Sequence, residues 1–144
     1  MLDAGRVRLG AVMCFEVSYD AAIRDVATDD VDVLAVQTNN SFYLGTAQLE
    51  QQWAITRMRA IETGRTVAVA ATTGISGLIA PDGHVLARSE GRTRQVLVAR
   101  VPAGQGRTPG IRWGAWVEVV GSAVAAVAIA ASLTSRARGG RPRG

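Results

Sequence analysis

Short apolar runs alternate with polar, helix-like segments over the first third of the chain. Residues 7–13 form a run rich in β-branched side chains that ends at Cys14, and residues 33–36 form a second run. Both patterns are typical of buried strands. Residues 19–27 lie between them and predict a helix with apolar side chains along one side. A strand, a helix and a strand in this order predict a parallel βαβ unit with a right-handed crossover.

The clearest helical pattern covers residues 46–63. Its apolar stripe consists of Leu49, Trp53, Ile55, Met58 and Ile61. Gly64 follows directly, and glycine is the residue that most often stops a helix. We therefore expect a helix of this length, with the stripe packed against a sheet.

Three further strands are predicted after this helix. Residues 66–72 form a run of valine and alanine, and residues 76–87 read as a hairpin around the Pro-Asp-Gly turn at residues 81–83. Residues 95–101 predict one more strand. We therefore expect an α/β domain over residues 1–101.

The composition changes after this domain. Residues 102–112 are rich in glycine and proline, as linkers are. Residues 113–133 are apolar and long enough to cross a bilayer, with Glu118 one turn from the start and a basic tail in residues 134–144. We predict a transmembrane helix with a cytoplasmic tail. The alternative is a buried or surface helix with a solvated tail.

The charge distribution supports a membrane flank more than a nucleic-acid-binding surface. The 144 residues carry a formal charge of +4, but residues 1–133 hold twelve arginines and twelve acidic residues. The whole excess therefore comes from four arginines in the tail, beside the apolar segment. One cysteine and one histidine exclude a disulfide framework and a zinc site, and we expect no cofactor and no nucleic-acid partner.

Cys14 is the candidate for covalent chemistry. It lies where a predicted strand meets a polar segment, so it falls with Asn39 at the carboxyl edge of the parallel strands, where sites collect. The alternative is a buried and inert thiol. His84 follows a tight turn in the hairpin and is a poor partner for the thiol. A base for Cys14 would therefore be a carboxylate or lie outside these residues, and Glu16 is close only in sequence.

Several motifs together carry a family resemblance. They are Cys14-Phe15-Glu16, the segment from Val33 to Tyr43, the Arg-Met-Arg-Ala helix in residues 51–62, the Thr-Thr-Gly-Ile-Ser stretch at 72–76 and the hairpin turn. In this order and spacing the chain resembles the C-terminal part of the bacterial apolipoprotein N-acyltransferase family, within the nitrilase superfamily. The resemblance runs from about Arg6 to Leu133. It implies the C-terminal half of a nitrilase-like αββα sandwich followed by one transmembrane helix.

The resemblance also implies a reaction. In that family a Glu–Lys–Cys triad takes an acyl chain from a phospholipid as a thioester and passes it to the α-amino group of a lipid-modified apolipoprotein cysteine. Cys14 matches the nucleophile, the backbone N–H of Phe15 an oxyanion donor, and Glu16 a supporting acid. The residues that match the substrate-binding loop are Asn39, Asn40, Phe42 and Tyr43. An acidic residue is common in place of Asn40, and tryptophan in place of Phe42.

The resemblance also defines what these residues lack. The family's base Glu and its Lys precede the cysteine, and this sequence contains no lysine. We therefore expect the C-terminal piece of an acyltransferase, from a truncated gene, a late start or a split polypeptide, that does not turn over alone. Its expected place is the bacterial cell membrane, with the domain on the extracytoplasmic side. The alternatives are a nitrilase-like amidase for a small C–N substrate, or a non-catalytic membrane-anchored remnant or subunit.

Overall fold

A computed structural model describes residues 1–90, 94–104 and 106–139, with backbone only from residue 134 onward. The chain divides into two compact units, one of residues 1–111 and one that begins at Arg112. The first unit contains the whole sheet and the candidate site. The second consists of the long C-terminal helix beyond Ile111.

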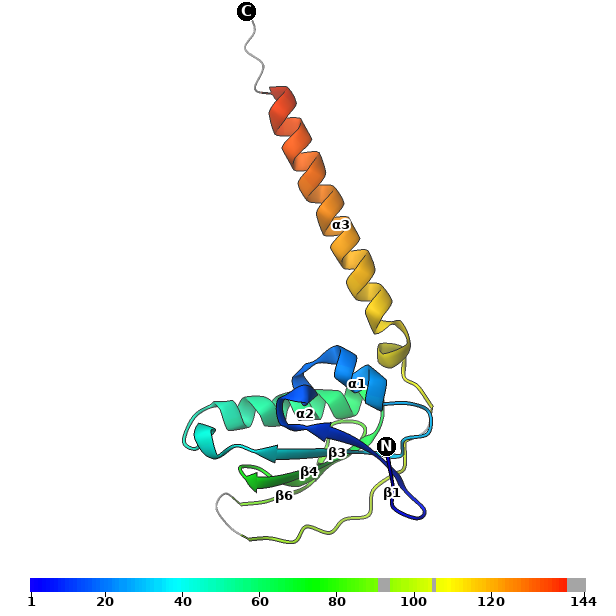
Figure 1. Cartoon of the computed structure of the whole chain (residues 1–144), viewed down its shortest axis with the longest axis vertical. Helices are drawn as coiled ribbons and strands as arrows, with labels where there is room; N and C mark the ends of the chain where they lie inside the picture. The colour runs from blue at the N-terminus through cyan, green and yellow to red at the C-terminus, as the bar shows by residue number, and fades with distance from the viewer. Residues whose placement is uncertain (91–93, 105, 140–144) are drawn as a thin grey trace, which may run out of the picture. The chain divides into compact units, whose positions relative to one another are not determined.

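The first unit is built on one mixed sheet whose six strands lie side by side in chain order (Figure 1). The strands are β1 (Leu2–Asp3), β2 (Arg8–Met13), β3 (Val33–Asn39), β4 (Thr66–Thr73), β5 (Gly77–Ile79) and β6 (Val85–Arg88). The central strands β2, β3 and β4 are parallel, and the outer strands pair antiparallel. The carboxyl ends of the three parallel strands therefore meet at one edge of the sheet.

Helices cover one face of this sheet. The helical elements are η1 (Cys14–Ser18), α1 (Asp20–Val26), η2 (Ser41–Tyr43), α2 (Gln48–Thr63) and α3 (Pro109–Gly139). Helices α1 and α2 lie on the same side of the strands in Figure 1. Helix α2 ends at Gly64, whose φ of 62° is the left-handed conformation that glycine adopts without cost.

The two faces of the sheet differ because side chains alternate along each strand. Val12 and Val36 point to the helices and belong to the hydrophobic core. On the opposite face Ala11, Ala35 and Ala68 pair across the three parallel strands. This small, apolar row has no helix against it in the described part of the chain (Figure 1).

A buried arginine fixes the amino end of the parallel strands. The Arg65 side chain is fully buried and donates hydrogen bonds to the carbonyl oxygens of Val31 (2.7 Å), Thr63 (2.9 Å) and Thr28 (2.6 Å). Burial lowers the pKa of this guanidinium. Two of these bonds tie the residue before β4 to the loop that leads into β3, and the bond to Thr63 ties it to the end of α2.

Most of the predicted order is confirmed. The βαβ unit is present, with β2 parallel to β3, and α2 covers residues 48–63 of the predicted 46–63. The hairpin of β5 and β6 is present around the predicted turn, where Gly83 has a φ of 82°. Strand β3 runs on to Asn39, so part of the polar cluster expected after it belongs to the strand. Strand β1 was not predicted.

The strand predicted over residues 95–101 is wrong. These residues form no strand in the structure, and Val96 and Val98 are 89% and 87% exposed. An alternating sequence becomes a strand only when a neighbouring strand supplies hydrogen bonds. The described part of the chain supplies none to this segment, and Val96 and Val98 are left in solvent.

The apolar stripe predicted for α2 is wrong in part. Met58 and Ile61 are 68% and 56% exposed. The buried face consists of Gln52, Trp53, Thr56, Arg59, Ala60 and Thr63. This face is mostly polar, because it packs against η1 and the end of β3 as well as against the apolar core.

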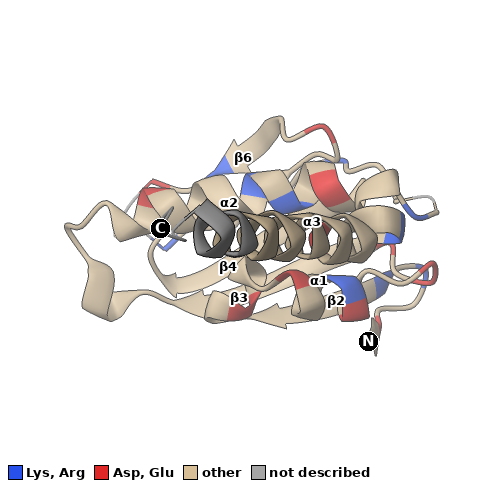
Figure 2. Ribbon diagram, turned by 90° about the horizontal axis from the view of Figure 1, so that it is seen from above, with Lys and Arg blue, Asp and Glu red and all other residues tan. Residues whose placement is uncertain are grey.

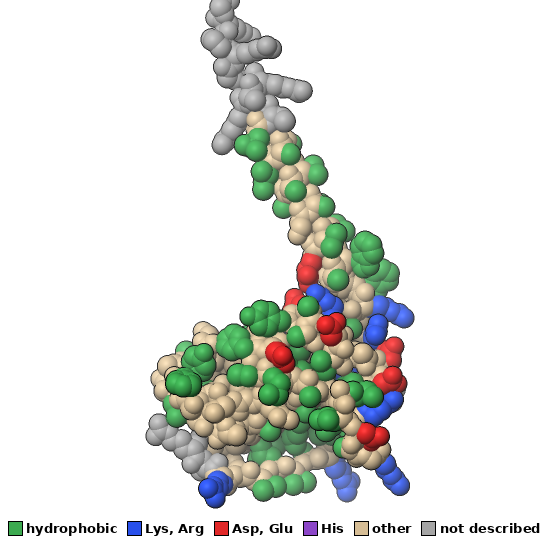
Figure 3. Space-filling view, in the orientation of Figure 1, with side chains coloured by type: hydrophobic (Ala, Val, Ile, Leu, Met, Phe, Trp, Pro, Cys, Tyr) green, Lys and Arg blue, Asp and Glu red, His purple; other side chains and the backbone are tan. Residues whose placement is uncertain are grey.

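Helix α3 differs in kind from the rest of the chain. Residues Pro109–Leu133 are long and apolar enough to cross a membrane, and Ile111 is the one buried residue among them. Twenty-five residues rise about 37 Å, against a hydrocarbon thickness of about 30 Å. Apolar side chains follow the helix over its described length (Figure 3). The helix begins at Pro109, four residues before the predicted span.

Candidate active site

The backbone is strained at the cysteine. Cys14 has a φ of 46°, and among the described residues it is the one non-glycine residue with a positive φ. Such a conformation costs of order 1–3 kcal/mol and collects at functional sites. It lets the chain turn from the end of β2 into η1 within one residue. Cys14 therefore sits on a sharp elbow, as the sequence indicated.

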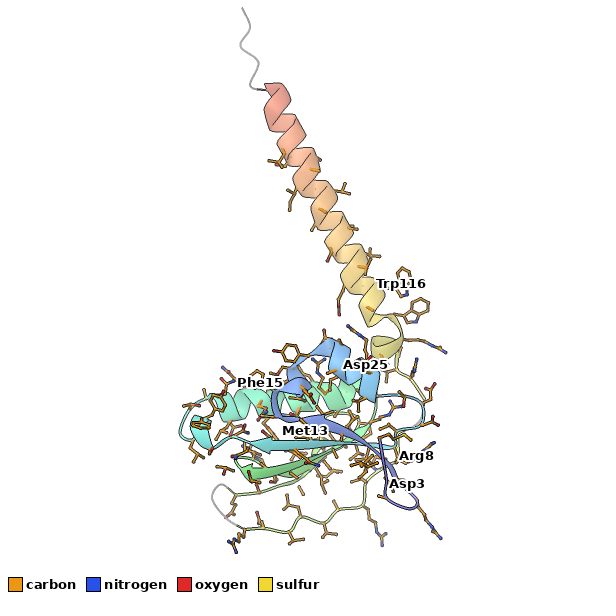
Figure 4. The ribbon with its side chains drawn as sticks, in the orientation of Figure 1. Asp3, Arg8, Met13, Phe15, Asp25 and Trp116 are labelled. Atoms are coloured by element: carbon orange, nitrogen blue, oxygen red, sulfur yellow. The ribbon has the colours of Figure 1, made fainter. Side chains whose placement is uncertain are left out.

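The elbow places the thiol at the carboxyl edge of the parallel strands. Figure 4 shows Met13 and Phe15, the neighbours of Cys14, beside the end of β2. The Cys14 side chain is partly exposed, and the hydroxyl of Thr38 on β3 lies 3.4 Å from its Sγ. The thiol is thus open to solvent on one side and touches a polar group on the other.

Glu16 belongs to the elbow itself. Its Oε2 accepts a hydrogen bond from the backbone N–H of Met13 at 2.8 Å, which closes the turn around Cys14. The Phe15 N–H lies in the first turn of η1, where a backbone donor has no partner within the helix. The predicted trio of Cys14, Phe15 and Glu16 is therefore brought together by one short helix.

Three buried polar side chains lie under the elbow, namely Thr38, Asn40 and Gln52. The Thr38 hydroxyl has one proton for two acceptors, Cys14 Sγ at 3.4 Å and Asn40 Oδ1 at 3.0 Å. Asn40 Nδ2 donates to Gln52 Oε1 at 2.6 Å, and Gln52 Nε2 donates to the Cys14 carbonyl oxygen at 3.3 Å. A closed set of bonds thus joins β3 and α2 to the cysteine.

Arg59 braces the far end of η1. Its Nε and Nη2 donate to the carbonyl oxygens of Val17 (2.8 Å) and Ser18 (3.0 Å). The guanidinium also pairs with Asp20 at 2.6 Å and Glu62 at 2.5 Å. Burial works to lower the pKa of Arg59, but the hydrogen bonds to these two carboxylates outweigh it and the pKa is raised. Arg59 stays charged and holds η1 against α2.

The four predicted substrate-binding residues take different places. Asn40 is buried in the polar set, and its side chain lies against Gly74, where an added Cβ would lie 3.1 Å from Asn40 Nδ2. Asn39 Oδ1 accepts from the Ser41 N–H, which is a local turn contact. Phe42 is 94% exposed, and Tyr43 is 39% exposed. Only Asn40 is bonded into the network under the thiol.

A cavity of about 810 Å³ lies near this edge of the sheet. It is bounded by the loop after η2, the β4–β5 loop and the chain after β6. Leu44 and Thr73 line it, Glu50 and Arg88 form an ion pair at its side, and Cys14 is not among its lining residues. The volume suits a ligand pocket.

Among the described residues we find neither a histidine bonded to the Cys14 thiol nor a group of metal ligands. His84 is exposed at the end of the hairpin turn, where its backbone N–H donates to Asp82 Oδ1. No group of three His, Cys, Asp or Glu side chains in residues 1–90, 94–104 and 106–139 could hold a metal ion. The arrangement suits a thiol nucleophile with a backbone oxyanion donor.

Sequence reasoning missed Thr38, Gln52 and Arg59. A signal for the last two was present, because Gln52, Thr56, Arg59 and Thr63 recur at intervals of four, three and four residues. Such a stripe of polar residues marks one face of a helix as clearly as an apolar stripe does. Thr38 had the weaker signal of following Val36 by two residues on the same side of β3.

The sequence is similar to proteins of a known family. The carbon-nitrogen hydrolase family model matches residues 1–109. An apolipoprotein N-acyltransferase of Mycolicibacterium smegmatis is 38% identical over 133 residues, which cover 90% of this chain and 22% of that protein. One of Ralstonia nicotianae is 35% identical over 92% of this chain and 25% of its own length. The chain thus spans about a quarter of the relatives that it matches.

The fold has relatives of known structure. A carbon-nitrogen hydrolase from Helicobacter pylori superposes with a TM-score of 0.56 over 62% of this chain and 39% of that protein. The two are 18% identical, so this likeness concerns the fold alone. Much of the described fold is therefore shared with that protein.

Proposed function

The chain belongs to the carbon-nitrogen hydrolase family, and on this premise we propose that it carries the nucleophile of an apolipoprotein N-acyltransferase. The observation that supports this most is the elbow, where Cys14 takes a φ of 46° as the first residue of η1. The similarity to an apolipoprotein N-acyltransferase over 90% of the chain supports the proposed reaction class.

In the proposed reaction the Cys14 sulfur attacks the carbonyl carbon of a phospholipid ester. The C–S bond forms, the C–O bond breaks, and a lysophospholipid leaves with the thiol proton. The α-amino group of the S-diacylglyceryl-cysteine of a lipoprotein then attacks the thioester, which releases the thiol and leaves an amide. The Phe15 N–H would stabilise both oxyanions, a contribution of about 3–4 kcal/mol for one such donor in other enzymes.

The proton transfers need groups from outside these 144 residues. The sequence contains no lysine, and the Glu16 carboxylate is bonded to the Met13 N–H. We propose that a Glu and a Lys reach Cys14 from another segment or chain. The apolar row Ala11, Ala35 and Ala68 supports a second layer there, because a sheet face of this kind packs against another layer.

The proposed site of action is the surface of a bacterial cell membrane. Helix α3 has the length and composition to anchor the domain. Its apolar side chains favour an enzyme of lipid substrates over an amidase of small soluble substrates. In the proposed topology the domain lies on the extracytoplasmic side and the basic tail lies in the cytoplasm.

The test is a trapping experiment in membranes. Membranes from cells that produce the chain are incubated with phospholipid carrying a labelled acyl chain, and label on Cys14 is measured before and after neutral hydroxylamine. We expect a hydroxylamine-labile label that Cys14→Ala lacks. Membranes that label no cysteine would contradict the proposal. The purified 144-residue chain alone should give no N-acylated lipoprotein.

A further inference from the structure

We infer that Gln52 is a positioning residue that aims the Phe15 N–H at the oxyanion by holding the Cys14 carbonyl oxygen. The inference rests on the proposed acyl transfer to Cys14. Gln52 lies on α2, 38 residues from the cysteine, and its side chain is buried. Its Nε2 is 3.3 Å from the Cys14 carbonyl oxygen. No other side chain of the polar set donates to the backbone of the elbow.

The orientation of the Gln52 amide is fixed by its partners. A carbonyl oxygen only accepts hydrogen bonds, so the Gln52 atom that faces the Cys14 carbonyl is the nitrogen. Its Oε1 then faces Asn40 Nδ2 at 2.6 Å. The Gln52 side chain is held at both ends and cannot turn without losing two bonds in a buried place, which is costly.

The peptide that Gln52 holds is the one that supplies the oxyanion donor. Cys14 C=O and Phe15 N–H belong to the same trans peptide plane, in which the two groups point in opposite directions. A bond from Gln52 to the oxygen on the α2 side therefore directs the Phe15 N–H away from α2. The positive φ of Cys14 leaves this peptide in a strained turn that needs such a support.

Two reactions of Cys14 separate this role from general stability. Acylation by p-nitrophenyl butyrate passes through an oxyanion: the C–S bond forms, p-nitrophenolate leaves, and the thiol proton goes to the buffer. Alkylation by iodoacetamide is a displacement at carbon without an oxyanion, with iodide as the leaving group. The chain has one cysteine, so both rates report on Cys14 alone.

The variants are Gln52→Met and Gln52→Glu in the full 144-residue chain in detergent, with Gln51→Met as the matched control. Gln51 is the exposed neighbour on the same helix. Gln52→Glu keeps the oxygen that accepts from Asn40 and loses the donor to Cys14. If circular dichroism shows that Gln52→Met does not fold, Gln52→Glu alone is used for the test.

Both Gln52 variants should lower the acylation rate at least about tenfold and change the alkylation rate by less than about twofold. Gln51→Met should change neither rate. Acylation and alkylation that fall together, or neither falling, would overturn the positioning role. Wild-type rates whose ratio equals that of the chain in urea would contradict an oxyanion site of any kind. A normal Gln52 effect with no label from phospholipid in membranes would contradict only the proposed acyl donor.

Discussion

Helices α2 and α3 reverse the usual relation between polarity and burial. Helix α2 carries charged positions along its length (Figure 2), yet its buried face includes Gln52, Thr56 and Arg59. In α3, by contrast, residues 112–133 include no buried residue. The polar side chains of a buried helix need hydrogen-bond partners within the protein. An apolar helix with exposed side chains needs a non-aqueous environment such as a lipid bilayer.

The two helices have different proposed roles. Gln52 and Arg59 are seven residues apart, two turns on one face of α2, and they hold the two ends of η1. The proposed role of helix α3 is attachment to the membrane. Changes in α2 should therefore alter folding and chemistry, and changes in α3 should alter location.

The largest effect is expected for Arg59→Met. It removes the donors to the Val17 and Ser18 carbonyls and leaves Asp20 and Glu62 without their cation. We expect a loss of about 3–4 kcal/mol in the free energy of unfolding, with allowance for the partial exposure of the carboxylates.

Denaturant unfolding in detergent measures this loss. The matched control is Arg57→Met, since Arg57 makes one bond to the Gly83 carbonyl and should cost about 1 kcal/mol. Equal losses for the two variants would show that the polar face of α2 does not brace η1.

A smaller effect is expected for Val120→Arg in α3. Val120 lies near the centre of the apolar window and is 56% exposed. A charge at the middle of a bilayer costs about 2.5–3.5 kcal/mol, so the variant should leave the membrane fraction on alkaline carbonate extraction. The free energy of unfolding of the domain should not change.

Leu133→Arg is the control, because it lies at the end of the window. It should remain in the membrane fraction, since a long charged side chain there reaches the interface. If both variants stay in the membrane fraction, α3 does not span the bilayer.

The smallest effect is expected for Met58→Gln. Met58 belongs to the apolar stripe of α2 that the sequence predicted as buried, and its side chain is 68% exposed. The substitution should change the free energy of unfolding by less than about 0.5 kcal/mol. A loss above 1 kcal/mol in the 144-residue chain would show that Met58 is covered in solution.

Local patterns explain which parts of the fold could be predicted. The strands β2 and β3, the stop at Gly64 and the hairpin turn depend on short-range chemistry that the sequence contains. The strand prediction for residues 95–101 was wrong because a strand depends on hydrogen bonds from a neighbouring strand. The prediction that Met58 is buried was wrong because apolar periodicity does not say which face of a helix packs. Strand β1 has two residues and no period to detect.

The site follows the same rule. Cys14 and Glu16 could be proposed from the sequence because the elbow is local. Thr38 and Gln52 reach Cys14 from 24 and 38 residues away, through buried polar contacts that only the folded chain creates. Asn40 was expected at the edge of a pocket, and the structure gives it an internal place between these two residues.

The most direct test of the central claim is the chemical state of Cys14 in the membrane. The cysteine-containing peptide is recovered from membranes of cells that produce the chain, and its mass is measured before and after treatment with neutral hydroxylamine. The proposed acyl transfer predicts that a fraction of this peptide carries an acyl chain and returns to the free thiol on treatment. This fraction should be smaller in Gln52→Glu. A free thiol in every membrane sample, with and without added phospholipid, would contradict it.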